Sequence, residues 1–321
     1  MTERRLRALH TRFEYYWSPA NAARRGKKLT WRHFEWEIGD LFKRYKPGAT
    51  TTKGRKINIR NHWATRDPIR EAIIDGYSVT EEMFASPLNF LIHPSTTYCS
   101  IHERDVVFGA RYNAYGSQKR GTSIYANPEY EQGELLKTLK WAIMSSQEPE
   151  PFSAILVYPR WKMGKLMELL THHNVRLVAK FTRGSFSFMS PTHWQTGDQD
   201  TEGKNTSNWQ VLIIEVSNPQ GRATPQEGGH KNHNAEANII TAAVRTGAVQ
   251  STHTDPSFTR SSTPYRIKPP DGYLKARQGG GLPGQPPPHP SETLDNLTLT
   301  DLRDDESVVH EGGEDHLHRR L

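Results

Sequence analysis

The chain of 321 residues carries a net charge of +7, and only 34% of its residues are hydrophobic, which is polar for a fully folded protein of this length. No apolar stretch approaches the roughly 20 residues of a membrane-spanning helix, the N-terminus lacks the apolar run of a secretory signal, and the single cysteine, Cys99, excludes an internal disulfide. We therefore expect a soluble intracellular protein, without a membrane partner, in which part of the chain does not fold.

The first region, residues 1–78, is predicted to be helical. Its apolar residues recur at three- and four-residue spacing over 3–16 and again between Thr30, a candidate N-cap, and Tyr45. A third helix is predicted to begin at Ile69. We expect these helices to form a small region of their own ahead of the main domain.

This first region is also strongly basic. Residues 1–70 hold 18 Lys and Arg against 6 Asp and Glu, a net charge of +12. Such an excess indicates contact with a polyanion, and the basic segments 24–28 and 53–56 are candidates for phosphate contacts. Interleaved Trp and Tyr residues favour a nucleic acid, because bases stack on such rings. A solvated basic face over an ordinary helical core explains the same pattern.

The second region, residues 79–218, alternates short apolar runs with helical stretches, which is typical of a parallel α/β sheet. The predicted strands are 81–85, 95–101, 122–126, 152–158, 175–181 and 209–216, and the predicted helices between them are 132–146 and 162–173.

The third region, residues 219–321, is predicted to be a disordered tail. It contains 11 Gly and 11 Pro and no Trp, so it cannot bury enough apolar surface to offset the chain entropy. A short amphipathic patch at 294–302 could dock onto a partner, but a solvated coil is the simpler interpretation.

The most informative motif is Asn127-Pro128-Glu129-Tyr130, which directly follows a predicted strand and precedes a helix. Ligands bind at the carboxyl ends of strands in open α/β sheets. An Asn side chain and the carbonyl of the next residue can each accept one N–H of an exocyclic amine, which would orient that nitrogen for attack on a methyl group. Tyr130 offers a flat ring to hold a base. Asn-Pro is also a common turn dipeptide, so the motif alone is weak.

The neighbouring strand ends strengthen the interpretation. Ser86, Pro87 and Asn89 lie in a tight loop after the first predicted strand, where a bound cofactor would be held. Asp105 follows the second strand, where an acidic side chain can accept hydrogen bonds from ribose hydroxyls.

Together these blocks resemble the phosphorylated-CTD-interacting factor family, the cap-specific adenosine-N6 methyltransferases. The resemblance covers about residues 79–218, with the order and spacing of the blocks preserved. The blocks are Phe84-Ala-Ser-Pro-Leu-Asn89, Tyr98-Cys-Ser100, Asp105 with Phe108-Gly109, Ala126-Asn-Pro-Glu-Tyr130 and Tyr158-Pro-Arg-Trp161, closed by Trp209 to Glu215.

The resemblance implies a Rossmann-like methyltransferase core that uses S-adenosylmethionine and no metal. It implies that Asn127 and Pro128 hold the target amine and that Tyr130 stacks on the adenine of capped mRNA. Carried over in the same way, Ser86, Pro87, Asn89 and Asp105 would contact the cofactor. Trp161 and Lys162 would meet the RNA, although simple packing of Trp161 is also possible. The nucleus is the expected compartment, with the cytoplasm as the alternative.

Two departures qualify these expectations. The family motif is Asn-Pro-Pro-Phe, so Glu129 replaces a proline that would fix the direction of the preceding carbonyl, and Tyr130 replaces a phenylalanine. The chain also lacks a two-tryptophan module, so we do not expect binding to the polymerase tail. Three functions stay open: an RNA adenosine-N6 methyltransferase, a catalytically impaired RNA-binding relative, and a methyltransferase for DNA or uncapped RNA.

Overall fold

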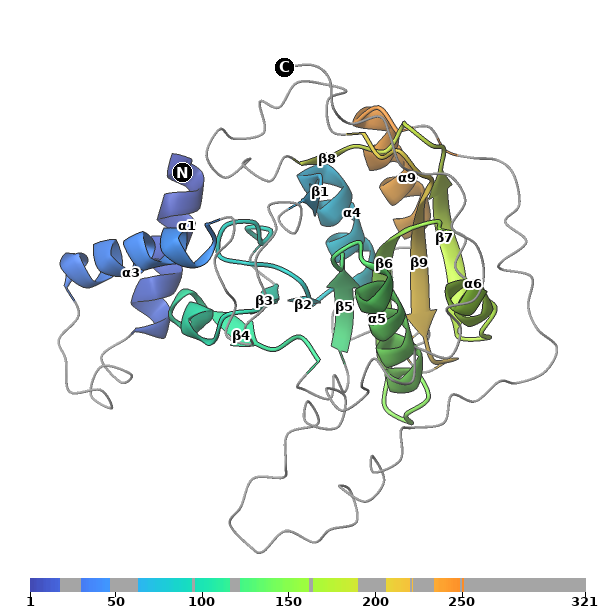
Figure 1. Ribbon diagram of the computed structural model, residues 1–321, viewed down its shortest axis with the longest axis horizontal. Coiled ribbons are helices and arrows are strands. Elements are labelled where there is room, and N and C mark those ends of the chain that lie inside the picture. The colour runs from blue at the N-terminus through green and yellow to red at the C-terminus, as the bar shows by residue number, and fades with distance from the viewer. Residues whose placement is uncertain are drawn as a thin grey trace, which may run out of the picture. The chain divides into compact units, whose positions relative to one another are not determined.

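A seven-stranded sheet organises the part of the chain that the structure describes (Figure 1). The computed structural model describes residues 1–17, 30–46, 63–93, 96–115, 122–161, 164–189, 206–219, 221, 234–248 and 250. Within the sheet the strands lie in the order β4–β3–β2–β5–β6–β9–β7. Their bounds are β2 Glu81–Glu82, β3 Thr97–Ser100, β4 Ala110–Tyr112, β5 Thr122–Ala126, β6 Phe152–Pro159, β7 Val175–Phe181 and β9 Val211–Ser217.

Most of the sheet is parallel. The pairs that join β4, β3, β2, β5 and β6 are all parallel, whereas β9 runs antiparallel to both of its neighbours, β6 and β7. Every residue of β6 and β9 is buried, which explains why both strands are continuous apolar runs rather than alternating ones. The predicted α/β class with a mostly parallel sheet is confirmed.

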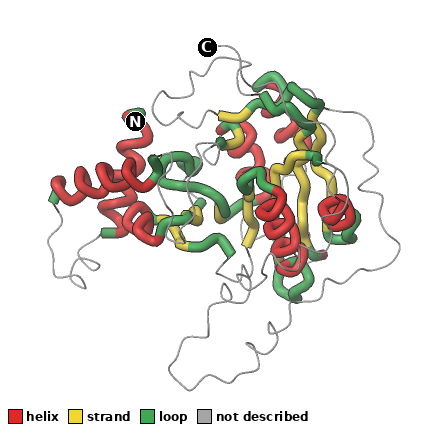
Figure 2. The backbone as a smooth tube through the Cα atoms, in the orientation of Figure 1, coloured by secondary structure: helices red, strands yellow, loops and turns green. Residues whose placement is uncertain are grey.

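Helices cover both faces of this sheet, so the fold has three layers (Figure 1). On one face α5 (Gln132–Ser145) lies beside α6 (Gly164–Leu170), and α5 contacts β6 and β9. On the other face α4 (Asp67–Tyr77) packs along α9 (Ala235–Arg245), and α9 contacts β7. Figure 2 shows these helices flanking the strands.

The helix α9 corrects the prediction that the disordered tail begins at residue 219. Its sequence AEANIITAAVR is rich in helix-forming alanine, and Ile239 and Ala243 are fully buried in the same apolar core as Ile73 of α4. At Gly76 of α4 a Cβ atom would come within 2.7 Å of the Cβ of Ala235, so a glycine allows the two helices to approach closely. Residues 251–321 of the predicted tail lie outside the described residues.

The first two helices pack on the other end of the sheet. The helix α1 (Glu3–Tyr16) begins with Thr2, whose side chain accepts a hydrogen bond from the Arg5 N–H, and α3 (Trp31–Arg44) begins at the predicted N-cap Thr30. Their apolar faces enclose a second core with residues of β3, β4 and the 3-10 helix η2 (Glu103–Phe108). In contrast, α4 packs in the sheet's main core, so the predicted helical region is divided between two cores.

Several predicted elements agree with the structure in type and position. The bounds of α1, β5 and β7 are those predicted, whereas β2 has only two residues where five were expected. The sequence did not reveal β4, η2 or the antiparallel pair of β1 (Ala64–Thr65) with β8 (Phe188–Met189). None of the helices in the described ranges combines the length and the apolar character needed to cross a bilayer.

Candidate active site

The topology of the sheet defines where a ligand would bind. From β2 the chain continues to β3 and β4 on one side, and it then returns to β5 and β6 on the other side. Between β2 and β5 the order therefore reverses, and in open α/β sheets ligands bind beyond the carboxyl ends of strands at such a switch point. Two loops leave the sheet there, residues 83–91 after β2 and residues 127–131 after β5.

The loop after β5 presents the side chain of Asn127, which is half-buried. Its Nδ2 donates to the carbonyl oxygen of Trp63 at 3.4 Å, and its Oδ1 accepts from the hydroxyl of Tyr130 at 3.1 Å. Because a carbonyl can only accept, the contact with Trp63 fixes which end of the carboxamide is the nitrogen. The carboxamide oxygen therefore faces Tyr130 and keeps a second lone pair for another donor.

Aromatic rings line this end of the sheet. The Tyr130 ring makes edge contacts with Trp161, Trp209 and Phe188 at centroid distances of 6.4, 5.9 and 5.8 Å, and Trp161 lies 5.9 Å from Trp209. Trp63 continues the cluster, because its ring is 6.2 Å from Phe188. Tyr130 and the three tryptophan side chains of this cluster are half-buried, whereas Phe188 is buried. Trp161, for which simple packing is the alternative to contact with RNA, packs against Tyr130 and Trp209.

The short pair of β1 and β8 brings Trp63 to this site. Thr65 pairs with Phe188, and the Arg66 Nε donates to the Ser187 hydroxyl at 2.9 Å, which ties the segment before α4 to the segment after β7. The sequence does not reveal this contribution, because strands of two residues have no periodic signal and Trp63 lies 64 positions before Asn127.

The loop after β2 is held by its own side chains. Asn89 Oδ1 accepts from both the N–H of Ser86, at 2.7 Å, and its hydroxyl, at 2.9 Å, while the Ser86 oxygen accepts from the Leu88 N–H at 3.2 Å. Ser86, Pro87 and Asn89 are all buried, and Phe84 is the half-buried ring of the loop. The structure thus gives Ser86 and the Asn89 oxygen a role in shaping the loop, and contact with a cofactor stays a prediction for both.

A buried arginine anchors both ends of this loop. Arg70 of α4 is fully buried and donates to Glu82 Oε1 at 2.9 Å and to the carbonyl of Asn89 at 2.8 Å, and it pairs with Asp67. The other Glu82 oxygen accepts from the Leu91 N–H at 2.9 Å. Burial alone would lower the pKa of Arg70, but the two carboxylates outweigh it and raise the pKa.

The N-terminal helix holds the same loop from its other side. Arg5 of α1 is buried, donates to the carbonyl of Phe90 at 2.6 Å, and lies 4.7 Å from the centre of the Phe90 ring. Arg12 covers the ring at 4.6 Å. Burial and the nearby Arg70 lower the pKa of Arg5 to about 10, so it is charged at neutral pH.

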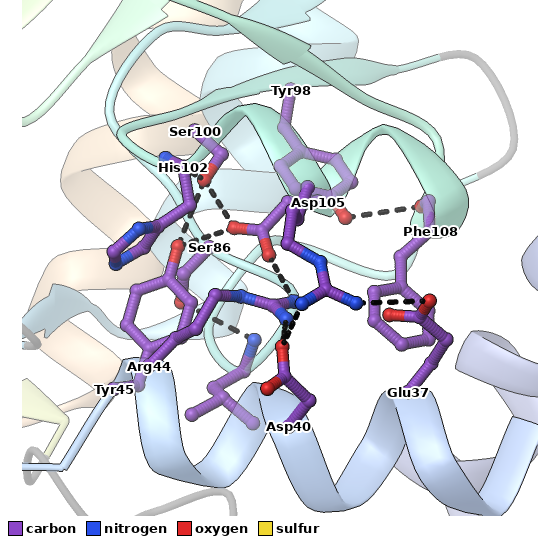
Figure 3. A network of polar contacts seen from close by, with 12 residues as sticks. Glu37, Asp40, Arg44, Tyr45, Ser86, Tyr98, Ser100, His102, Asp105 and Phe108 are labelled. Carbon is purple, nitrogen blue, oxygen red and sulfur yellow. Dashed lines mark hydrogen bonds and ion pairs between the residues drawn. The ribbon is translucent and has the colours of Figure 1, made fainter. Parts of the chain in front are cut away.

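Asp105 lies in a buried network rather than at an open edge (Figure 3). One carboxylate oxygen accepts from Arg44 at 2.7 Å, and the other accepts from the Tyr45 hydroxyl at 2.5 Å and from the hydroxyl of Ser100. These contacts tie the end of α3 to β3 and η2. Asp105 is therefore fully engaged by the protein in this conformation, and its predicted contact with a ribose would require the network to open.

The remaining predicted residues are less defined. Glu129 is half-buried beside Asn127, and Pro128 is buried. Lys162, and the basic segments 24–28 and 53–56, lie outside the described residues. Among the residues that the structure describes, no group of three or more His, Cys, Asp and Glu side chains could hold a metal ion.

Comparison with known families gives one match. A family model described as the Phosphorylated CTD interacting factor 1 WW domain matches residues 6–190. This range is more than half of the chain, and it extends from α1 to the end of β8, so it includes both loops of the candidate site. A comparison with curated proteins finds no match.

Proposed function

The chain belongs to the phosphorylated CTD interacting factor 1 family, and on this premise we propose that it transfers a methyl group from S-adenosylmethionine to the N6 nitrogen of an adenosine in RNA, near the capped 5′ end. The observation that carries the proposal is the position of Asn127 and Pro128, directly after β5 at the switch point of the sheet. Side chains there can reach a ligand held by the loop of the adjacent strand.

The residues around the loop after β2 are compatible with S-adenosylmethionine. The rings of Phe84 and Tyr115 lie edge to face, with 5.6 Å between their centroids, and form an apolar corner against which an adenine ring could pack. The hydrogen bonds that Asn89 makes with Ser86 use only its Oδ1, so its Nδ2 group can donate to a cofactor oxygen. When bound, the cofactor would supply an electrophilic methyl group on a positively charged sulfur.

The chain's own contribution to transfer is orientation of the amine. Asn127 Oδ1 can accept one N–H of an adenine amine through its second lone pair, and the Pro128 carbonyl, which has no partner among the described residues, can accept the other. Holding both hydrogens directs the nitrogen lone pair towards the methyl group and disfavours its conjugation with the ring. No general base is required, because the proton leaves after the amine has become positively charged.

The aromatic cluster supports an RNA substrate. Tyr130, Trp161 and Trp209 give apolar ring surface next to Asn127, and a base removed from its stack is held by such surfaces. The basic first region would bind phosphates and position the RNA without reading its sequence. A nuclear location is part of the proposal, whereas binding of a phosphorylated polymerase tail is not.

A second candidate function is RNA binding without catalysis. It is favoured by the engagement of Asp105 with Arg44, Tyr45 and Ser100, which leaves this predicted cofactor contact tied to the protein. Glu129 in place of proline points in the same direction, because it relaxes the restraint on the Pro128 carbonyl.

Transfer of a labelled methyl group to matched oligonucleotides distinguishes the candidates. The full chain is incubated with labelled S-adenosylmethionine and adenosine-initiated RNA, either capped or uncapped, or the corresponding DNA. We expect transfer to capped RNA. Transfer only to uncapped RNA or to DNA would contradict the proposed capped substrate and identify the other one. Tight RNA binding without any transfer would favour the non-catalytic function.

A further inference from the structure

The hydroxyl of Tyr130 makes a contact that the proposed function does not explain. Stacking on a base requires only the ring, and a phenylalanine would supply it. In this chain the tyrosine hydroxyl lies 3.1 Å from Asn127 Oδ1 and 3.5 Å from the carbonyl of Val157. It carries one proton, and the nearer acceptor is the Asn127 oxygen.

We propose that the Tyr130 hydroxyl is a positioning group, which donates to Asn127 Oδ1 and holds the carboxamide with its oxygen at the site of methyl transfer. This inference rests on the proposed function, and it assigns to Tyr130 a role in addition to ring stacking. Tyr130 acts through Asn127, so it need not touch the amine itself.

The contacts of the carboxamide explain why it needs this restraint. An asparagine side chain rotates about its terminal bond, and a rotation by half a turn would present the NH2 group instead of the acceptor oxygen to the substrate. The opposing contact, from Asn127 Nδ2 to the Trp63 carbonyl, is long at 3.4 Å and therefore weak. A flipped carboxamide would turn its oxygen towards the Trp63 carbonyl, which cannot donate, and would leave only the Val157 carbonyl at 3.5 Å to accept the Tyr130 proton. The shorter contact from the Tyr130 hydroxyl to Oδ1 therefore reinforces the orientation that the Trp63 carbonyl favours.

The surroundings of Tyr130 keep its hydroxyl in place and protonated. Trp161, Trp209 and Phe188 each contact the Tyr130 ring in an edge-to-face arrangement, and packing against three rings restricts its rotation. Burial raises the pKa of Tyr130 well above its usual value near 10, and nearby Tyr125 adds to the effect. The hydroxyl therefore stays a donor throughout the neutral range.

A Tyr130→Phe substitution in the full chain tests the proposal with two readouts. The first is the side-chain amide resonance of Asn127 in protein labelled with nitrogen-15 asparagine, assigned by its loss in Asn127→Ala. We expect this resonance to shift in Tyr130→Phe. The second is methyl transfer, for which we expect kcat to fall about tenfold, with an unchanged dissociation constant for S-adenosylmethionine.

The matched control is Tyr98→Phe, which removes another buried hydroxyl that donates to a backbone carbonyl, that of Phe108 at 3.0 Å, without contacting Asn127. This variant should leave the Asn127 resonance in place. An unchanged Asn127 resonance in Tyr130→Phe would overturn the proposal, and so would a shifted resonance with unchanged kcat. If the unmodified chain transfers no methyl group, the proposed function fails, while the resonance still decides whether the hydroxyl orients Asn127.

Discussion

The fully buried Arg70 gives the sharpest test of how the loop after β2 is held. Arg70→Met removes the donor to Glu82 Oε1 at 2.9 Å and to the Asn89 carbonyl at 2.8 Å, and it leaves the Glu82 carboxylate, whose side chain is 6% exposed, without its cation. Breaking one side of a buried ion pair costs ~3–5 kcal/mol. We therefore expect the free energy of unfolding to fall by about that amount.

The assay is denaturant unfolding of the full chain at pH 7, followed by tryptophan fluorescence and circular dichroism. Arg7→Met is the matched control, because it breaks an ion pair with Glu3 whose side chains are 77% and 75% exposed. Such a pair contributes less than ~1 kcal/mol. The double variant Arg70→Met/Glu82→Gln should recover at least ~1 kcal/mol relative to Arg70→Met, because it removes the unpaired charge.

Two results would refute this reasoning. One is a loss in Arg70→Met as small as that in Arg7→Met. The other is strict additivity of the Arg70 and Glu82 substitutions, since it would mean that the two groups do not interact. Arg70→Lys keeps the charge but loses the paired geometry. A larger dissociation constant for S-adenosylmethionine in this variant would show that Arg70 also supports cofactor binding.

Four further changes test other parts of the account. Burial, assisted by Arg44 and opposed by Asp105, lowers the pKa of His102. The stabilising contribution of neutral His102 is complete above its unfolded pKa of about 6.5 and is lost as the pH falls. His102→Gln should therefore flatten the loss of stability between pH 7 and pH 5, and parallel stability curves for the two proteins would contradict this. Asp105→Asn should cost ~3 kcal/mol in denaturant unfolding, because Arg44 loses a buried partner at 2.7 Å, and a cost below ~1 kcal/mol would show that the network is not needed. Glu129→Pro should raise kcat, since proline restrains the preceding carbonyl, whereas a loss of transfer would mean that Glu129 takes part in the reaction. Trp161→Ala should raise KM for RNA about tenfold at unchanged cofactor affinity, and an unchanged KM would remove Trp161 from the RNA site.

The sequence predicts the elements of this fold where periodicity is strong. The strands β5 and β7 and the helix α1 appear at the predicted residues, because short runs rich in apolar residues and three-and-four spacing are local properties. The helix α9 is not predicted, because the prediction for residues 219–321 rests on their overall Gly- and Pro-rich composition, in which an alanine-rich segment of 11 residues does not stand out. Its burial depends on α4, about 165 positions earlier in the chain, and such a contact has no local signal.

The candidate site is likewise only partly predictable from the sequence. Asn127 and Pro128 are found from the sequence, because a motif directly after a strand has a defined place in an α/β sheet. The contributions of Trp63 and Arg70 depend on the two-residue pair of β1 with β8 and on the packing of α4, which only the three-dimensional structure contains. Asp105 illustrates the converse, because a plausible motif position is occupied by contacts with α3 that the sequence does not reveal.

The most direct test of the central claim is nucleoside analysis by mass spectrometry. Capped RNA beginning with adenosine is digested after incubation with S-adenosylmethionine and either the unmodified chain or Asn127→Ala. We predict N6-methyladenosine from the unmodified chain and about a hundredfold less from Asn127→Ala, because the amine loses its acceptor. Full activity of Asn127→Ala, or methylation at another atom of the nucleoside, would contradict it.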